Sequence, residues 1–113
     1  MKRESDAVLL RIFFGEKDRY DGQPLYKYLV RYLRENHFSG ATVLRGMEGF
    51  GHRSIVHSAD FLDLSSDLPL VIEVVDTEEK MATFKKHLDE NKVLNSGLLT
   101  EERVTIVRYG SLS

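Results

Sequence analysis

Three glycines alternate with large or charged residues between Arg45 and Arg53, and this stretch is the part of the chain best suited to chemistry. Glycine allows a positive φ and lets a backbone approach a ligand closely. Consecutive amides in such a turn form an anion-binding nest. Arg45, His52 and Arg53 supply positive or protonatable side chains beside it. The stretch predicts a site for a phosphate-bearing small molecule; the alternative is a hairpin tip whose glycines only permit the bend.

Histidines and carboxylates near this stretch raise two further alternatives. His52 and His57 lie five residues apart with Asp60 and Asp63 nearby, and such side chains bind divalent metal ions. Their spacing matches no stringent metal motif, so no metal site is predicted. His52 and Glu48 suit general acid–base work, which leaves a small enzyme open as an alternative. Because neither a P-loop nor a Gly-x-Ser-x-Gly motif occurs, the leading prediction is a protein that is not an enzyme.

Length, charge and the lack of cysteine narrow the class of protein. The 113 residues suit one domain over residues 1–113. Without cysteine, disulfides, thiolate catalysis and cysteine-ligated metals are excluded. The formal net charge of -2 provides no bulk attraction to nucleic acid, so no nucleic-acid partner is predicted. No apolar run approaches the ~20 residues of a membrane helix, which predicts a cytoplasmic protein without membrane insertion.

Hydrophobic periodicity divides the chain into two similar halves. In each half, a strand-like run precedes a helical stripe and a second strand-like run. The first run alternates in Ala7–Phe14 and is rich in β-branched residues in Leu68–Val75. Asp76 with Glu79 resembles a capping box at the start of the second helix, and His87 is expected on that helix's solvated surface. The predicted strands are Ala7–Phe14, Ala41–Met47, Leu68–Val75 and Arg103–Tyr109, and the predicted helices begin at Pro24 and at about Asp76.

This order predicts an α+β ferredoxin-like fold, a β-α-β-β-α-β sandwich with a four-stranded antiparallel sheet. The strand order would be four, one, three, two, with both helices on one face. Glu73 is expected to pair with Arg11 or Arg45 on the other face. That face would also expose apolar residues of the two central strands, which another copy of the chain would cover. These apolar residues are Leu9, Phe13, Val71 and Val75.

The connection from Glu48 to Asp67 has no clear periodicity and forms a predicted long loop, about residues 48–67. A structureless loop of roughly 20 residues is uncommon in a compact domain and is usually functional or mobile. Its apolar residues suit docking on a partner or packing against a neighbouring subunit. They are Ile55, Val56, Phe61, Leu62 and Leu64.

Short motifs recur in a fixed order along the chain. Gly49-Phe50-Gly51 stands at the base of the long loop, as it does in the PII signalling superfamily. The longer series resembles the PII-like proteins of domain-of-unknown-function family 190, and the resemblance covers about residues 10–109. The series consists of Gly-Phe-Gly-His at 49–52, His57-Ser58, Leu64-Ser65-x-Asp67-Leu68-Pro69 and Ile72-Glu73-Val74-Val75-Asp76.

The resemblance implies a PII-like homotrimer that binds an adenine nucleotide in clefts between subunits. It also implies that the long loop regulates a protein partner, such as a transporter or an enzyme. His52 stands where relatives often have a phosphate-binding arginine, and Ile106 stands where a second arginine of the last strand is typical. This smaller cationic set favours ADP or AMP over ATP. The residues that the resemblance places in the nucleotide site are Gly49, Phe50, Gly51, His52, Arg53 and Arg108.

Overall fold

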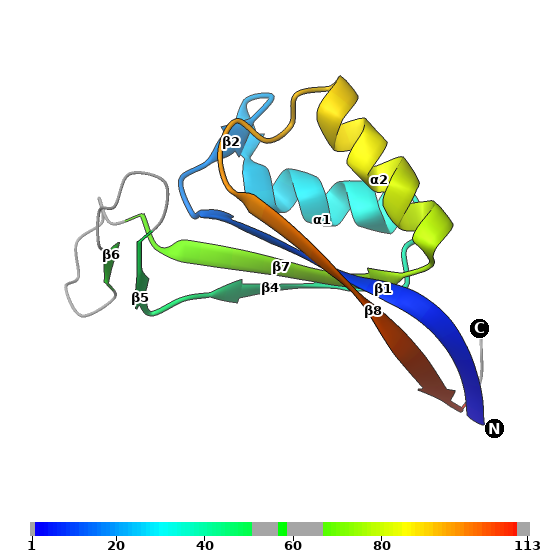
Figure 1. The fold of residues 1–113 in the computed structure, drawn as a ribbon. Helices are drawn as coiled ribbons and strands as arrows, with labels where there is room; N and C mark the ends of the chain where they lie inside the picture. The colour runs from blue at the N-terminus through cyan, green and yellow to red at the C-terminus, as the bar shows by residue number, and fades with distance from the viewer. Residues whose placement is uncertain (1, 51–56, 59–66, 111–113) are drawn as a thin grey trace.

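The computed structural model describes residues 2–50, 57–58 and 67–110. Its main sheet has four antiparallel strands in the order β4-β7-β1-β8, and the two helices cover one face (Figure 1). The predicted strand order and ferredoxin-like fold are therefore confirmed. The main strands are β1 (Lys2–Gly15), β4 (Ala41–Arg45), β7 (Pro69–Asp76) and β8 (Leu98–Tyr109), the helices are α1 (Leu25–Glu35) and α2 (Glu78–Glu90), and β2 (Arg19–Tyr20) pairs with β3 (Gln23–Pro24).

The core lies between the sheet and the helices because one side of each element is apolar. Every second residue of β7 is buried, as period-two alternation requires. The buried residues of α1 and α2 recur at the three- to four-residue spacing of an amphipathic helix. Five core side chains are completely shielded from solvent: Leu10, Ile12, Leu29, Ile72 and Phe84.

The start of α2 differs from the capping-box prediction by one residue. Thr77, and not Asp76, is the N-cap, and its hydroxyl accepts a hydrogen bond from Lys80 N at 3.2 Å. Asp76 is 5% exposed, and its carboxylate accepts bonds from the amides of Thr77 and Ser39, both at 2.7 Å. The buried carboxylate therefore joins the start of α2 to the turn between α1 and β4, a tertiary role that a local motif does not reveal.

The two terminal strands each begin five residues earlier than predicted, β1 at Lys2 and β8 at Leu98. β1 pairs with β7 only from Val8 onward, whereas its pairing with β8 extends back to Lys2, the first residue of β1, opposite Tyr109, the last residue of β8. Residues 2–6 and 105–109 thus form a two-stranded ribbon that projects from the main sheet (Figure 1). Residues 2–6 are polar and exposed, so hydrogen-bonded pairing and not burial defines this part of β1.

Gly97 allows the connection after α2 to approach β1. Its φ is +116°, and a Cβ there would lie 2.6 Å from Phe13 O. Gly97→Ala should therefore lower the free energy of unfolding by about 1–3 kcal/mol. Gly40→Ala is a matched control, because its φ is not positive and the added Cβ meets no heavy atom within 4 Å. Urea unfolding at one protein concentration measures both variants; equal stabilities would contradict this steric requirement.

Candidate functional site

The loop base, residues 46–50, lies where β4 ends and β7 begins. A Cβ on Gly46 or Gly49 would lie 2.8 or 3.2 Å from Pro69 Cγ, and Gly46 N donates to Pro69 O at 2.7 Å. Neither glycine has a positive φ. Of the two properties of glycine that the sequence suggested would matter here, a positive φ is therefore not used at these positions. Close packing against Pro69 is what favours a residue without a side chain.

A short ladder occupies the start of the long connection, where the sequence showed no strand signal. β5 (Glu48–Gly49) pairs with β6 (His57–Ser58). Next to this ladder, Phe50 is 70% exposed and Met47 is 74% exposed. Glu48 is also exposed, so the described part of the loop base presents backbone, apolar side chains and a carboxylate to its surroundings. The remaining residues predicted for this part of the site, Gly51, His52 and Arg53, lie outside the described residues.

Both ends of the long connection are held against the turn that follows β1. Glu16 N donates to Leu68 O at 2.8 Å, and Lys17 N donates to the Asp67 carboxylate at 2.7 Å. At the other end, Arg45 forms an ion pair with Glu16. The charge of Arg45 is therefore already balanced by a carboxylate at the loop base.

The sheet face away from the helices carries an apolar row across all four strands. Leu44, Val71, Phe13 and Leu98 are successive neighbours in register. Leu44, Phe13 and Leu98 are 48%, 37% and 61% exposed, respectively. The row bears out the prediction of an apolar open face and extends it to both edge strands. An exposed apolar patch of this kind is characteristic of a surface that another molecule covers.

Beside the apolar row, the same face carries a charged pair. Arg11 Nε donates to Glu73 Oε2 at 2.7 Å, and Glu102 lies 3.7 Å from Arg11 Nη1. The hydrogen bond to Glu73 raises the pKa of the Arg11 guanidinium above its ordinary value. Register places Arg45 opposite the buried Leu70, on the helix side of the sheet. Of the two expected partners of Glu73, Arg11 is therefore correct and Arg45 is wrong.

Arg108 lies far from the loop base. Leu98, at the start of β8, pairs with Phe13 at the loop-base end of the sheet. Arg108 is ten residues further along β8, which is about 30 Å at the usual rise of a strand. At that end its Nη2 donates to Ser39 Oγ at 2.7 Å. Within one protomer, the structure does not bring Arg108 together with the other predicted site residues that it describes.

The helices carry a cluster of titratable side chains around His87, the member that the sequence placed at a solvated helix surface. His87 Nε2 lies 2.6 Å from Tyr28 Oη, and the His87 ring stacks on Tyr32 with centroids 4.1 Å apart. Asn91 Nδ2 lies 3.1 Å from His87 Nδ1. The expectation of a solvated His87 is thus wrong, because these contacts join α1 to α2. Burial raises the pKa of Tyr28 and of Tyr32, so both hydroxyls stay protonated at neutral pH.

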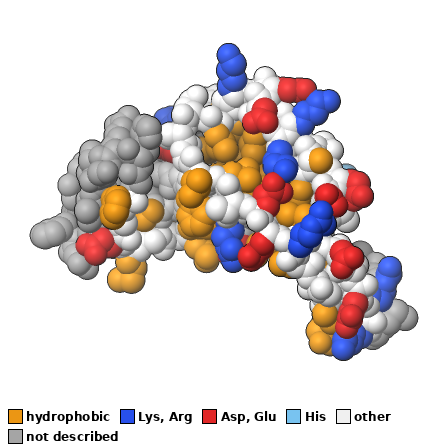
Figure 2. Space-filling model, viewed as in Figure 1, with side chains coloured by type: hydrophobic (Ala, Val, Ile, Leu, Met, Phe, Trp, Pro, Cys, Tyr) orange, Lys and Arg blue, Asp and Glu red, His pale blue; other side chains and the backbone are white. Residues whose placement is uncertain are grey.

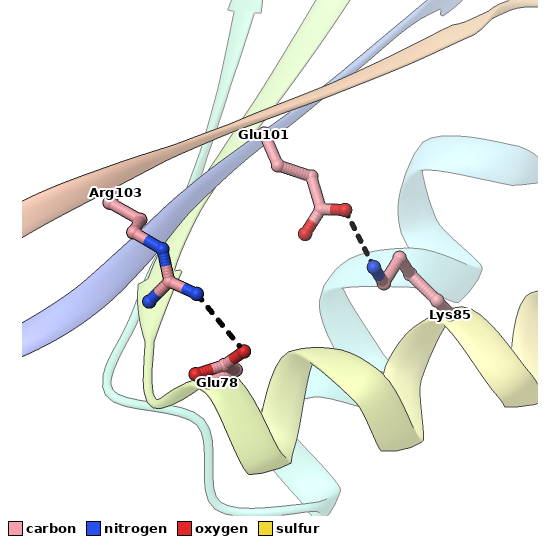
Figure 3. Close-up of polar contacts among 4 residues, drawn as sticks. All are labelled: Glu78, Lys85, Glu101 and Arg103. Atoms are coloured by element: carbon pink, nitrogen blue, oxygen red, sulfur yellow. Dashed lines mark hydrogen bonds and ion pairs between the residues drawn. The ribbon is translucent and has the colours of Figure 1, made fainter.

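An open depression of about 580 Å³ lies between α2 and the start of β8. Two ion pairs tie these elements together, Lys85 to Glu101 at 2.6 Å and Arg103 to Glu78 at 3.3 Å (Figure 3). Acidic and basic side chains are interspersed over this side of the molecule (Figure 2). No described residue of the predicted site lines the depression. Across residues 2–50, 57–58 and 67–110, no group of three or more His, Asp or Glu side chains is placed to hold a metal ion.

The sheet order and the helix layer define a ferredoxin-like fold. The chain is similar to CPII from Thiomonas intermedia K12 bound to ADP and bicarbonate, with a TM-score of 0.64 and 13% identity over 92% of this chain and 91% of CPII. A second structure of CPII, a nitrogen regulatory PII-like protein bound to ADP, AMP and bicarbonate, has a TM-score of 0.57, with 13% identity and the same coverage. These likenesses establish the fold.

Sequence comparison then identifies the family. The chain matches the DUF190 family, described as "Uncharacterized ACR", over residues 7–106. It is 39% identical over 99 residues to a UPF0166 protein of Aquifex aeolicus (strain VF5), covering 88% of this chain and 91% of that protein. It is 37% identical over 93 residues to a UPF0166 protein of Methanocaldococcus jannaschii, covering 82% and 84%. The chain belongs to the DUF190 family, which confirms the resemblance seen in its motifs.

Neither α1 nor α2, the two helices in the described part of the chain, is long and apolar enough to cross a membrane.

The tyrosines between the helices should make stability fall at high pH. Because burial raises their folded-state pKa above the unfolded value of about 10, deprotonation favours the unfolded chain. The free energy of unfolding should hold below about pH 10 and decrease as pH rises through the folded pKa values. Ultraviolet titration should show late-ionising tyrosines that disappear in Tyr28→Phe and Tyr32→Phe. Tyr109→Phe, at a 74% exposed site, is the control; an identical titration for all variants would contradict the assignment.

Proposed function

We propose that this chain is a regulatory, non-enzymatic PII-like protein of the cytoplasm that binds an adenine nucleotide in clefts between the subunits of a homotrimer. Residues 1–113 act as one domain, and the long loop, residues 48–67, regulates a protein partner such as a transporter or an enzyme. Support comes from membership of the DUF190 family and from the PII-like fold. CPII, which shares this fold, binds ADP and AMP.

The observation that carries the proposal is the separation of Arg108 from the loop base. The two lie toward opposite ends of β8, so no small ligand can contact both within one protomer. A cleft between subunits removes this conflict, because the projecting ribbon of one protomer can bring Arg108 to the loop base of its neighbour. The site would then comprise Gly49, Phe50, Gly51, His52 and Arg53 from one protomer and Arg108 from the next.

The apolar row on the open face supports assembly. Leu44, Phe13 and Leu98 expose hydrocarbon on one continuous surface, and burying it against other copies is favourable by roughly 25 cal/mol per Å². The neighbouring Arg11–Glu73 pair supplies charge that a partner must match, which gives the contact a preferred orientation. The same face that lacks helices is therefore the face on which the copies meet.

The charge balance at the loop base supports a ligand with few phosphates. Arg45 is already paired with Glu16, so it adds little to phosphate binding. Among the predicted site residues, His52, Arg53 and Arg108 then supply the positive or protonatable side chains for a ligand. ADP or AMP matches this set better than ATP, and exposed Phe50 can stack on the flat base.

Nucleotide binding is tested directly by calorimetry and thermal shift with ADP, AMP, ATP and bicarbonate. ADP or AMP should raise the unfolding midpoint. Arg108→Ala should weaken binding by about 1–3 kcal/mol, because a charge-assisted hydrogen bond to phosphate is lost. Arg31→Ala, which removes an exposed charge from α1, is the control. Binding of none of these nucleotides would refute the proposal, and turnover of a bound nucleotide would indicate the alternative, a small enzyme acting on a phosphorylated metabolite.

Assembly is tested by charging the apolar row. The double variant Leu44→Glu and Leu98→Glu should dissociate the trimer, because carboxylates would be buried without partners at the contact. Both sites are exposed in the protomer, so the fold itself should survive. Val30→Glu, at a 36% exposed site on α1, is the control and should remain trimeric. Light scattering measures the mass; a double variant with the mass of the wild type would show that the copies meet elsewhere.

A further inference from the structure

Two arginines lie directly opposite each other on the projecting ribbon. Arg3 pairs in register with Arg108, so both side chains leave the ribbon on the same face with their Cβ atoms about 5 Å apart. Both residues are exposed, and neither forms an ion pair with any residue in the described part of the chain. Like charges directly opposite each other destabilise an antiparallel pair. The ribbon therefore holds two cations together at a cost.

The acidic residues of the ribbon do not relieve this repulsion. Glu4 and Asp6 alternate with Arg3 along β1, so their side chains leave the opposite face of the ribbon. The next pair on the arginine face is Ser5 opposite Ile106, and both are uncharged. An anion from outside the ribbon would therefore relieve the repulsion between the two arginines.

Arg108 contacts an exposed serine whose backbone is held by a buried carboxylate. Its guanidinium donates to Ser39 Oγ at 2.7 Å, and Ser39 N donates to Asp76 Oδ2 at 2.7 Å. Asp76 is 5% exposed and also receives the amide of Thr77, so its carboxylate is fixed by the fold. One arginine of the pair is thus oriented before any ligand arrives, which reduces the entropy lost on binding.

We propose that Arg3 and Arg108 together form a two-guanidinium clamp for a phosphate group. This inference rests on the proposed nucleotide site, to which Arg108 belongs, and it adds Arg3 as the second cation. A phosphate placed between the two guanidinium groups removes their repulsion and accepts paired hydrogen bonds from each. The second cation comes from β1, the strand opposite, and compensates for the uncharged Ile106 next to Arg108 on this face.

The test is calorimetric titration of the full chain with ADP and, separately, with inorganic pyrophosphate. Arg3→Ala should weaken binding of both about tenfold, a loss similar to that for Arg108→Ala. Arg3→Glu should abolish binding while leaving the unfolding midpoint equal or higher, because glutamate opposite Arg108 forms a favourable cross-strand pair. Lys2→Ala is the matched control: it removes one positive charge from the neighbouring residue, whose side chain leaves the opposite face, and should bind like the wild type.

The two probes separate this inference from the proposed function. Pyrophosphate binding that depends on Arg3, without binding of any adenine nucleotide, would support the clamp and refute the nucleotide site. Wild-type affinity of Arg3→Ala for ADP, with weakened Arg108→Ala, would refute the clamp and leave the nucleotide site standing. Absence of binding for both probes would refute both. If Lys2→Ala and Arg3→Ala weakened ligand binding equally, the loss of affinity would be explained by net charge alone, and this result would also refute the clamp.

Discussion

The pairing of β1 with β8 is the constraint on which the rest of the molecule depends. β1 is a central strand, hydrogen-bonded to β7 along its second half and to β8 from Lys2 to Phe13. Because β1 pairs with β8 over more residues than with β7, residues 2–6 and 105–109 leave the sheet as one ribbon (Figure 1). The same register that builds the sheet therefore decides that Arg108 is distant from the loop base. The proposed site needs residues from two protomers because β8 is long enough to place Arg108 far from the loop base of its own protomer.

The two faces of the sheet are stabilised in different ways. On the helix side, Leu10, Ile12 and Ile72 are buried against α1 and α2. The protomer therefore buries the apolar residues of that face without another copy. On the other side, the apolar row and the Arg11–Glu73 pair remain at the surface. This asymmetry is ordinary for an antiparallel sheet covered on one side, except that the uncovered side is not polar throughout. In the proposed trimer, the face of the sheet without helices would contact other copies, and the ribbon that extends this sheet would contribute Arg108 to the ligand site.

The parts of the fold with a burial signal could be predicted from the sequence. The β-branched run Leu68–Val75 and the apolar stripe from Leu25 to Leu33 reflect contact with the core. The strand, the helix and the order of the strands in the sheet were therefore predicted correctly. The candidate site was less accessible. Gly46 and Gly49 were recognised as unusual, but the reason, contact with Pro69, depends on a residue about twenty positions away. The contacts of His87 with Tyr28 and Tyr32 could not be predicted, because a polar side chain does not contribute to the hydrophobic periodicity that reveals buried positions.

The sequence by itself determined the family through the resemblance carried by its ordered motifs. It also determined the order of the main elements and the residues that build the core, because apolar periodicity records which side of each element is buried. The tertiary structure alone decided the extent of β1 and β8, the partner of Glu73 and the position of Arg3 opposite Arg108. Those features depend on register between segments that lie about a hundred residues apart in the case of the ribbon. Exposed residues in a ladder are specified by the strand they pair with, and no local pattern of hydrophobicity encodes that choice.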